Sequence, residues 1–82
     1  MKHVEYITSG TCSRKIDFDL DDNNIIHNVI FTGGCNGNLK AISKLVEGKD
    51  ASEISKILIG NTCGTRSTSC ADQLAKALKE NL

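Results

Sequence analysis

Four cysteines are the residues of this chain whose chemistry stands out, and each lies at an expected element edge or in a segment rich in glycine, serine or threonine. They are Cys12, Cys35, Cys63 and Cys70. No pair has the two-residue spacing of a zinc knuckle or of a thioredoxin motif. Structural cysteines usually lie in apolar runs, where the thiol packs as a small hydrophobic group. The pattern therefore predicts that the fold brings thiols from distant loops into one site.

Two of the cysteines are expected in the first turn of a helix. Cys35 follows Gly33 and Gly34 where a strand gives way to a helix, and Cys70 follows Ser69, a predicted helix N-cap. The positive end of the helix dipole lowers the pKa of a thiol there, and the thiolate is the form that binds metal and attacks sulfur electrophiles. The alternative is that each cysteine only fills a tight turn.

A soft metal ion such as Zn²⁺ needs three or four soft ligands. Four cysteines could complete a tetrahedron, and so could three cysteines with His3 or His27, although each histidine is more typical of an ordinary surface or strand position. We expect a zinc site with an iron–sulfur cluster as the alternative cofactor. The expected thiolate ligands are Cys12, Cys35, Cys63 and Cys70.

The glycine-rich segment before the first expected helix could instead hold a phosphate. Backbone N–H groups of Gly33, Gly34, Gly37 and Asn38 could cradle an anion at the helix N-terminus. The segment matches neither the Walker A pattern nor G-x-G-x-x-G, so its glycines could equally serve a tight turn. A nucleotide-phosphate binding module therefore stays as an alternative function. No Ser-His-Asp triad or pair of catalytic carboxylates is apparent in the sequence.

The composition restricts the class of protein. The 82 residues carry ten basic and ten acidic side chains, which gives no electrostatic footprint for duplex nucleic acid or an anionic membrane. The N-terminus lacks the apolar run of a secretion signal, and no stretch approaches the roughly 20 apolar residues of a membrane span. We expect a cytoplasmic protein with reduced thiols. Its core is small, so a bound metal or a homodimer would add stability.

The first half of the chain reads as three strands, at residues 4–8, 13–20 and 25–32. In the second, Ile16, Phe18 and Leu20 share one face, and Asp17 and Asp19 share the other. The third is apolar on both faces, which predicts a central strand or one covered by helices. Short connections favour an antiparallel meander.

The second half reads as three helices, with apolar stripes at Leu39, Ile42, Leu45 and Val46; at Ile54, Ile57 and Leu58; and at Leu74, Ala75, Leu78 and Leu82. Gly48 and Gly60 predict helix ends. Asp50 and Ser69 are predicted N-caps, and Asp72 is expected to reach back and complete a capping box. The order predicts a single α+β domain over residues 1–82, a three-stranded antiparallel sheet followed by three helices packed on one face.

The segment Thr68-Ser69-Cys70-Ala71-Asp72 resembles the Thr-Ser-Cys-Pro-Asp motif for which TSCPD domains are named. The similarity to stand-alone members extends over nearly the whole chain, through Gly10-Thr11-Cys12-Ser13, Gly33-Gly34-Cys35-Asn36-Gly37-Asn38-Leu39, residues 42–48 and Cys63-Gly64. Ala71 and Asn36 stand where the family usually has proline. Proline suits the first helical turn, but alanine is a good helix former, so we expect the geometry at residue 71 to be retained.

This resemblance implies a link to deoxyribonucleotide synthesis, because the family occurs alone or at the C-terminus of cobalamin-dependent ribonucleotide reductases. Members are often catalogued as ribonucleoside-diphosphate reductase, but 82 residues cannot contain the radical barrel, cobalamin site and substrate site of that enzyme. We therefore expect a metal-binding accessory domain that is not catalytic alone. Its expected partner is a ribonucleotide reductase or another large enzyme. The alternative is a carrier of electrons, sulfur or an iron–sulfur cluster.

A more distant similarity is to the U-type iron–sulfur cluster scaffolds, which share the β-β-β-α-α-α order. Cys12, Cys35 and Cys70 lie at elements comparable to those of the three scaffold cysteines. The sequence Cys12-Ser13-Arg14 lacks the aspartate that follows the first scaffold cysteine. This departure argues against cluster assembly and transfer, but not against metal binding.

Overall fold

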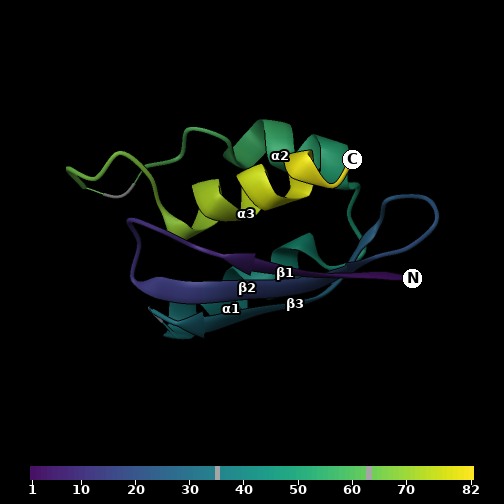
Figure 1. Ribbon diagram of the computed structural model, residues 1–82, viewed down its shortest axis with the longest axis horizontal. Helices are drawn as coiled ribbons and strands as arrows, with labels where there is room; N and C mark the ends of the chain where they lie inside the picture. The colour runs from purple at the N-terminus through teal and green to yellow at the C-terminus, as the bar shows by residue number, and fades with distance from the viewer. Residues whose placement is uncertain (35, 63) are drawn as a thin grey trace.

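Three strands are followed by three helices in the computed structural model, which describes residues 1–34, 36–62 and 64–82 (Figure 1). The elements are β1 (Lys2–Ile7), β2 (Ser13–Leu20), β3 (Ile26–Gly33), α1 (Asn36–Val46), α2 (Ala51–Leu58) and α3 (Cys70–Glu80). The predicted α+β order is confirmed. Within the described residues, no helix is both long enough and apolar enough to cross a membrane.

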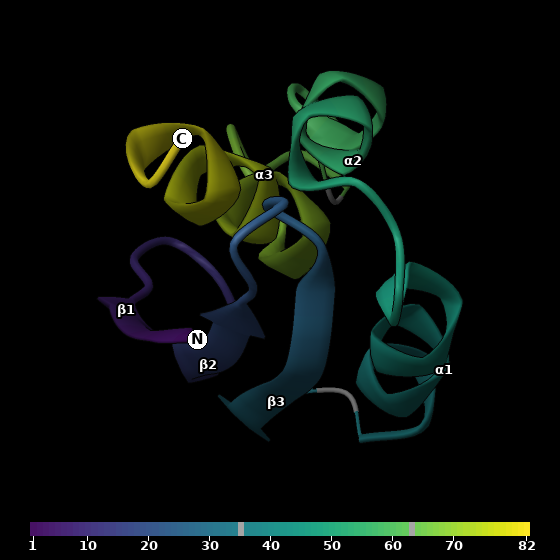
Figure 2. The ribbon, with the colours of Figure 1, turned by 90° about the vertical axis from the view of Figure 1, so that its right-hand side faces the viewer.

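The sheet is an antiparallel meander in the order β1-β2-β3. Its register places Val4 opposite Phe18 and Ile16 opposite Phe31. The predicted alternation of β2 is confirmed, since Ile16 and Phe18 are fully buried while Asp17 lies on the opposite, outer face. Because the face that carries the aspartates has no helix layer, it stays open to solvent (Figure 2).

The apolar third strand is not central. β3 pairs with β2 along one side, and α1 packs beside it, so that it forms an edge of the described sheet (Figure 2). Its Val29 is buried in the core, but Ile30 points to the outer face and is 59% exposed. The helix layer covers one face of β3 and leaves Ile30, on the other face, in solvent, whereas Phe31 still packs against the core.

One hydrophobic core lies between the sheet and the helices. α2 and α3 lie side by side, and both views show them on the side of the sheet opposite its open face (Figures 1 and 2). The largest fully buried side chains come from β2, β3 and α3, and they are Ile16, Phe18, Leu20, Ile26, Leu74 and Leu78.

Three residues of the predicted apolar stripes lie outside this core. Leu45 and Ile57 are each 71% exposed, and Leu82 is 51% exposed. α1 buries Leu39 and Val46, which lie seven positions apart on one face, and Leu45 falls off that face. Leu82 lies two residues beyond the end of α3, so no helical geometry directs it to the core.

Candidate functional site

Cys12 and Cys70 meet although 58 positions separate them. Their Sγ atoms are 3.9 Å apart, and both are free thiols. Cys12 lies in the loop between β1 and β2 and is exposed, whereas Cys70 opens α3 and is buried. Two sulfurs that bind one zinc ion are roughly 3.5–4 Å apart, given Zn–S bonds near 2.3 Å. The two thiols are therefore spaced as ligands of a common ion would be.

Ser69 fixes the start of α3 and thereby the position of Cys70. The Ser69 hydroxyl accepts a hydrogen bond from the Asp72 N–H at 3.1 Å and donates one to the Asn61 carbonyl. The predicted N-cap is confirmed. Because Ser69 also bonds Asn61, the cap ties α3 to the loop that follows α2.

Asp72 does not complete the predicted capping box. Its Oδ1 accepts from the Gly60 N–H at 2.7 Å, and its Oδ2 accepts from the Thr68 hydroxyl at 2.5 Å. A capping box uses glutamate or glutamine, and aspartate is one methylene shorter. The Thr68 hydroxyl, ahead of the Gly60 N–H and the Lys76 ammonium, outweighs burial and lowers the pKa of Asp72. The buried carboxylate thus joins the end of α2 to the start of α3.

Gln73 connects the loop of Cys12 to α3. Its Oε1 accepts from the Ser9 N–H at 3.3 Å, and its Nε2 donates to Thr68 Oγ1 at 3.0 Å. The side chain is buried. Gln73 was not identified from the sequence as a positioning residue. The one signal for it was a polar side chain next to Leu74, at the start of the apolar stripe of the last helix. Together with the cap, this amide holds the two thiol-bearing segments in register.

Hydrogen bonds in the site lower the pKa of Cys70. Burial raises the pKa of this thiol, but hydrogen bonds with the side chain and backbone of Ser13, the Thr11 side chain and Cys12 outweigh that effect. The direction agrees with the sequence prediction, which relied on the helix dipole. The shift favours the thiolate, which is the form that binds metal.

A cavity of about 250 Å³ opens beside the two thiols. Its lining includes Cys12, Cys70, Arg66, Leu39 and Thr62. Leu39 belongs to the start of α1, and Thr62 belongs to the loop between α2 and α3. The cavity is therefore shared by three segments of the chain that are distant in sequence.

The other two predicted ligands, Cys35 and Cys63, lie outside the described residues. The residues that precede them in the chain are described. A Cβ placed on Gly34 would lie 3.2 Å from Cys12 Sγ, and Thr62 lines the cavity. The described residue before each of the two cysteines thus lies near Cys12 or lines the cavity.

Each histidine has carboxylate partners. His3 bonds Asp19 and Asp17 on the outer face of the sheet, and His27 bonds Asp21 and Glu47. Among the described residues, neither histidine lines the cavity beside the thiols. The alternative ligand set of three cysteines and a histidine receives no support from this arrangement.

Two glycines of the predicted phosphate cradle, Gly33 and Gly34, are needed by the turn itself or packed within it. Gly33 and Gly34 have φ angles of +81° and +82°, and a Cβ on Gly34 would lie 2.9 Å from Leu39 Cδ1. Gly37 lies on α1 with open space around it, and Asn38 lines the cavity. The turn therefore requires glycine at residue 34, and phosphate binding stays a prediction.

The family model described as the TSCPD domain matches residues 1–82. The match spans all three strands and all three helices, and it includes the loop of Cys12 and the start of α3. No curated protein and no solved structure matches the chain.

Proposed function

This chain belongs to the TSCPD domain family, and we propose that it is an accessory domain of ribonucleotide reduction that holds a metal ion through cysteine thiolates. The association of the family with ribonucleotide reductases supports the proposed role in ribonucleotide reduction. The observation that carries the metal-binding part is the 3.9 Å separation between Cys12 Sγ and Cys70 Sγ. The proposed partner is a ribonucleotide reductase or another large enzyme.

The donor chemistry of the described thiols fits a soft metal ion. Cys12 and Cys70 have the spacing of two ligands on one zinc, and the lowered pKa of Cys70 favours the thiolate. Of the residues that precede the other two cysteines, Gly34 lies against Cys12 Sγ and Thr62 lines the cavity beside the thiols. We therefore propose Cys12, Cys35, Cys63 and Cys70 as the ligands of Zn²⁺.

A closed four-thiolate zinc site is structural, because it leaves no open position for a substrate. In this chain it would fasten the β1–β2 loop, the start of α1 and the loop before α3 to one another. A domain of 82 residues has a small core, so such a fastening would contribute to the free energy of folding. The proposed role is a rigid docking domain rather than a reductase.

A thiol redox or sulfur-carrier role is the second candidate, favoured by the contact between the exposed Cys12 and the activated Cys70. In that role the two thiols would form a disulfide and lose two protons and two electrons to a disulfide of the partner enzyme. The partner disulfide would become two thiols. An iron–sulfur cluster on the same cysteines is the alternative to zinc that we propose for the site.

The metal content of the protein tests the proposal. The chain should be purified without a polyhistidine tag, in reducing buffer and without a chelator. We expect colourless protein with one zinc bound by thiolates, and we expect Cys12→Ser and Cys70→Ser each to lose it. Metal-free protein with fast-reacting thiols would favour the redox role, and brown protein would favour a cluster.

The accessory role needs a separate measurement. Deletion of the gene is expected to lower the cellular pools of deoxyribonucleotides relative to ribonucleotides. A copy of the gene with Cys70→Ser is expected not to restore them, whereas the wild-type copy is. Unchanged pools in the deletion strain would contradict a role in ribonucleotide reduction.

A further inference from the structure

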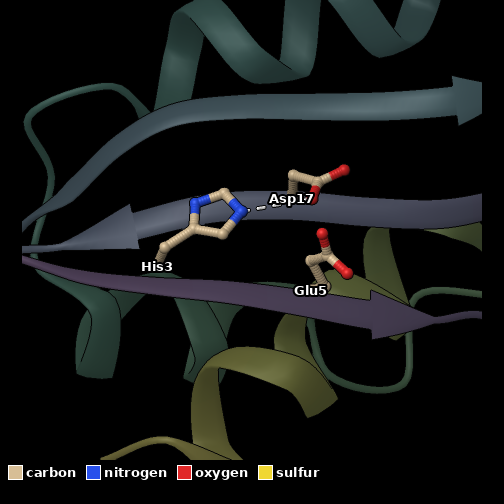
Figure 3. A group of neighbouring side chains, drawn as sticks. All are labelled: His3, Glu5 and Asp17. Carbon is tan, nitrogen blue, oxygen red and sulfur yellow. Dashed lines mark hydrogen bonds and ion pairs between the residues drawn. The ribbon is translucent and has the colours of Figure 1, made fainter.

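Three potential metal ligands gather on the outer face of the sheet, away from the helix layer. Figure 3 shows His3 and Glu5 on β1 beside Asp17 on β2, with the imidazole directed toward Asp17. One ligand atom from each residue lies within 4.8 Å of the other two. The strand register explains the cluster, because Glu5 pairs with Asp17 and His3 pairs with Asp19.

Asp19 orients the imidazole of His3 through a hydrogen bond to one of its two ring nitrogens. Nδ1 of His3 is 2.7 Å from Asp19 Oδ1, and Asp19 is itself bonded by the Asn28 side-chain amide at 3.0 Å. Since a carboxylate only accepts hydrogen bonds, Nδ1 carries a proton. Nε2 is hydrogen-bonded to Asp17 at 3.3 Å, so it too carries a proton in the metal-free protein, and an arriving metal ion would displace that proton. Histidines that bind metals commonly donate their other nitrogen to a carboxylate in this way.

The charges around the cluster favour a cation. Glu5 and Asp17 are directly opposite on neighbouring strands, and like charges in such positions are destabilising. Lys15 supplies partial compensation, with Nζ 3.5 Å from Asp17 Oδ2. Asp17 is only 13% exposed, so water screens its charge less than at a fully open position.

We propose that His3 Nε2 and the carboxylates of Glu5 and Asp17 bind a divalent transition-metal ion, with Asp19 orienting the histidine. Three atoms within 4.8 Å of one another all lie within about 2.8 Å of a common point. Rotation of the exposed His3 and Glu5 side chains closes this to the roughly 2.0–2.2 Å of metal bonds to nitrogen and carboxylate oxygen. Three protein ligands leave room for water on the ion, and nitrogen with carboxylate oxygen suits Mn²⁺ or Zn²⁺.

This site is separate from the thiol site in place and in chemistry. The two carboxylates suit Mn²⁺, whereas thiolates select softer ions. Mn²⁺ is therefore the probe, used on the untagged whole chain. We expect saturable binding by calorimetry. We also expect paramagnetic broadening of backbone amide signals in nuclear magnetic resonance spectra, centred on residues 3–5 and 17–19.

Substitutions identify the ligands. His3→Gln and Asp17→Asn are each expected to weaken Mn²⁺ binding at least about tenfold, and Asp19→Asn about tenfold through the loss of its outer-shell bond. Glu53→Gln is the matched control, since it removes one carboxylate from an exposed position on α2. Equal affinities for Glu5→Gln and Glu53→Gln, or broadening spread over carboxylates elsewhere, would overturn the proposal.

Thermal unfolding distinguishes a metal site from a purely structural cluster. In a chelator, Glu5→Gln is expected to melt at or above the wild-type temperature because it removes repulsion with Asp17. With Mn²⁺ the wild type is expected to gain stability and Glu5→Gln to gain none. A variant with Cys12→Ser and Cys70→Ser is expected to keep the Mn²⁺ affinity, so failure of the thiol site leaves this test intact. A wild type that gains no stability at saturating Mn²⁺ would contradict the site.

Discussion

The Ser9 backbone N–H donates a hydrogen bond to Gln73 Oε1 at 3.3 Å, and this bond joins the loop of Cys12 to the helix of Cys70. The same side chain donates to Thr68 at its other end. The buried amide of Gln73 therefore connects the loop between β1 and β2 with the segment that precedes α3. Its removal should separate the two thiols as well as weaken the fold.

Gln73→Leu tests this connection. Leucine keeps the bulk but leaves the Ser9 N–H without its partner, so we expect a loss of about 1–3 kcal/mol in the free energy of unfolding. We also expect slower formation of a disulfide between Cys12 and Cys70. Urea unfolding and timed oxidation measure the two effects. Lys79→Leu, at an exposed position of α3, is the control and should change neither; an unchanged oxidation rate in Gln73→Leu would contradict the positioning role.

Mild oxidation should link Cys12 to Cys70. A disulfide needs its sulfurs about 2.05 Å apart, so the 3.9 Å gap closes with a small side-chain movement. Diamide treatment of the metal-free protein is expected to give a crosslinked peptide pair that contains these two residues. Mass spectrometry of a nonreduced digest detects it, and bound zinc should slow the reaction. Preferential pairing of other cysteines in the metal-free protein would contradict the described site.

Two glycines only three positions apart should respond oppositely to alanine. Gly34→Ala places a methyl group 2.9 Å from Leu39 and 3.1 Å from the Ser13 nitrogen, at a φ of +82°. We expect it to cost more than about 1 kcal/mol. Gly37→Ala meets open space within α1 and should stabilise by about 0.4–1 kcal/mol. Thermal and urea unfolding of both variants provides the measurement, and equal effects would show that the turn does not need glycine at residue 34.

His27 should make stability depend on pH. Its hydrogen bonds to Asp21 and Glu47 raise the pKa of His27 from the ordinary value of 6.5. The pKa of Glu47 is lowered, first by the hydrogen bond from the Asn28 N–H and then by the bond with His27. The bond with His27 also lowers the pKa of Asp21. The histidine contribution is complete below pH 6.5 and is lost as the pH rises through the folded-state pKa. The carboxylate contributions are present above about pH 4.5 and are lost as the pH falls through their lowered values.

Melting temperatures from pH 5.5 to 8.5, measured with a chelator, check this prediction. The wild type should become less stable as the pH rises, and His27→Gln should lose less over the same range. The charge of His27 also interacts weakly with Asp19. The pKa of His3 is raised as well, so some loss of stability with rising pH should remain in the His27→Gln variant. Parallel curves for the two proteins would show that His27 contributes nothing.

Local sequence patterns predicted the elements, because the forces that form them act between near neighbours. The alternation along β2 and the Ser69 cap depend on residues a few positions apart, and both are confirmed. Patterns failed where burial depended on a distant neighbour. Helical spacing marked Ile57 as apolar stripe, but no element of the described chain covers it sufficiently, and it is 71% exposed.

The candidate sites depended even more on contacts between distant residues. Cysteines in polar loops indicated a shared thiol site, but the 3.9 Å contact needed the packing of the β1–β2 loop on α3. His3, Glu5 and Asp17 gave no signal in the sequence, because their meeting requires the register of β1 on β2. The sequence predicted that Asp72 would complete the capping box with Ser69. Its carboxylate instead accepts a hydrogen bond from the Gly60 N–H, whose position depends on where α2 ends.

The contact between Cys12 and Cys70 also sets an order of events during synthesis. β1, β2 and β3 follow one another and pair as neighbours, so the sheet can form while later residues are still on the ribosome. Cys70 is translated 58 residues after Cys12, and until then Cys12 has no partner from α3. A metal ion that needs both thiols can be captured only after the start of α3 has left the ribosome and packed near Cys12. Metal loading of the site would therefore report that α3 has been synthesised and has docked on the sheet.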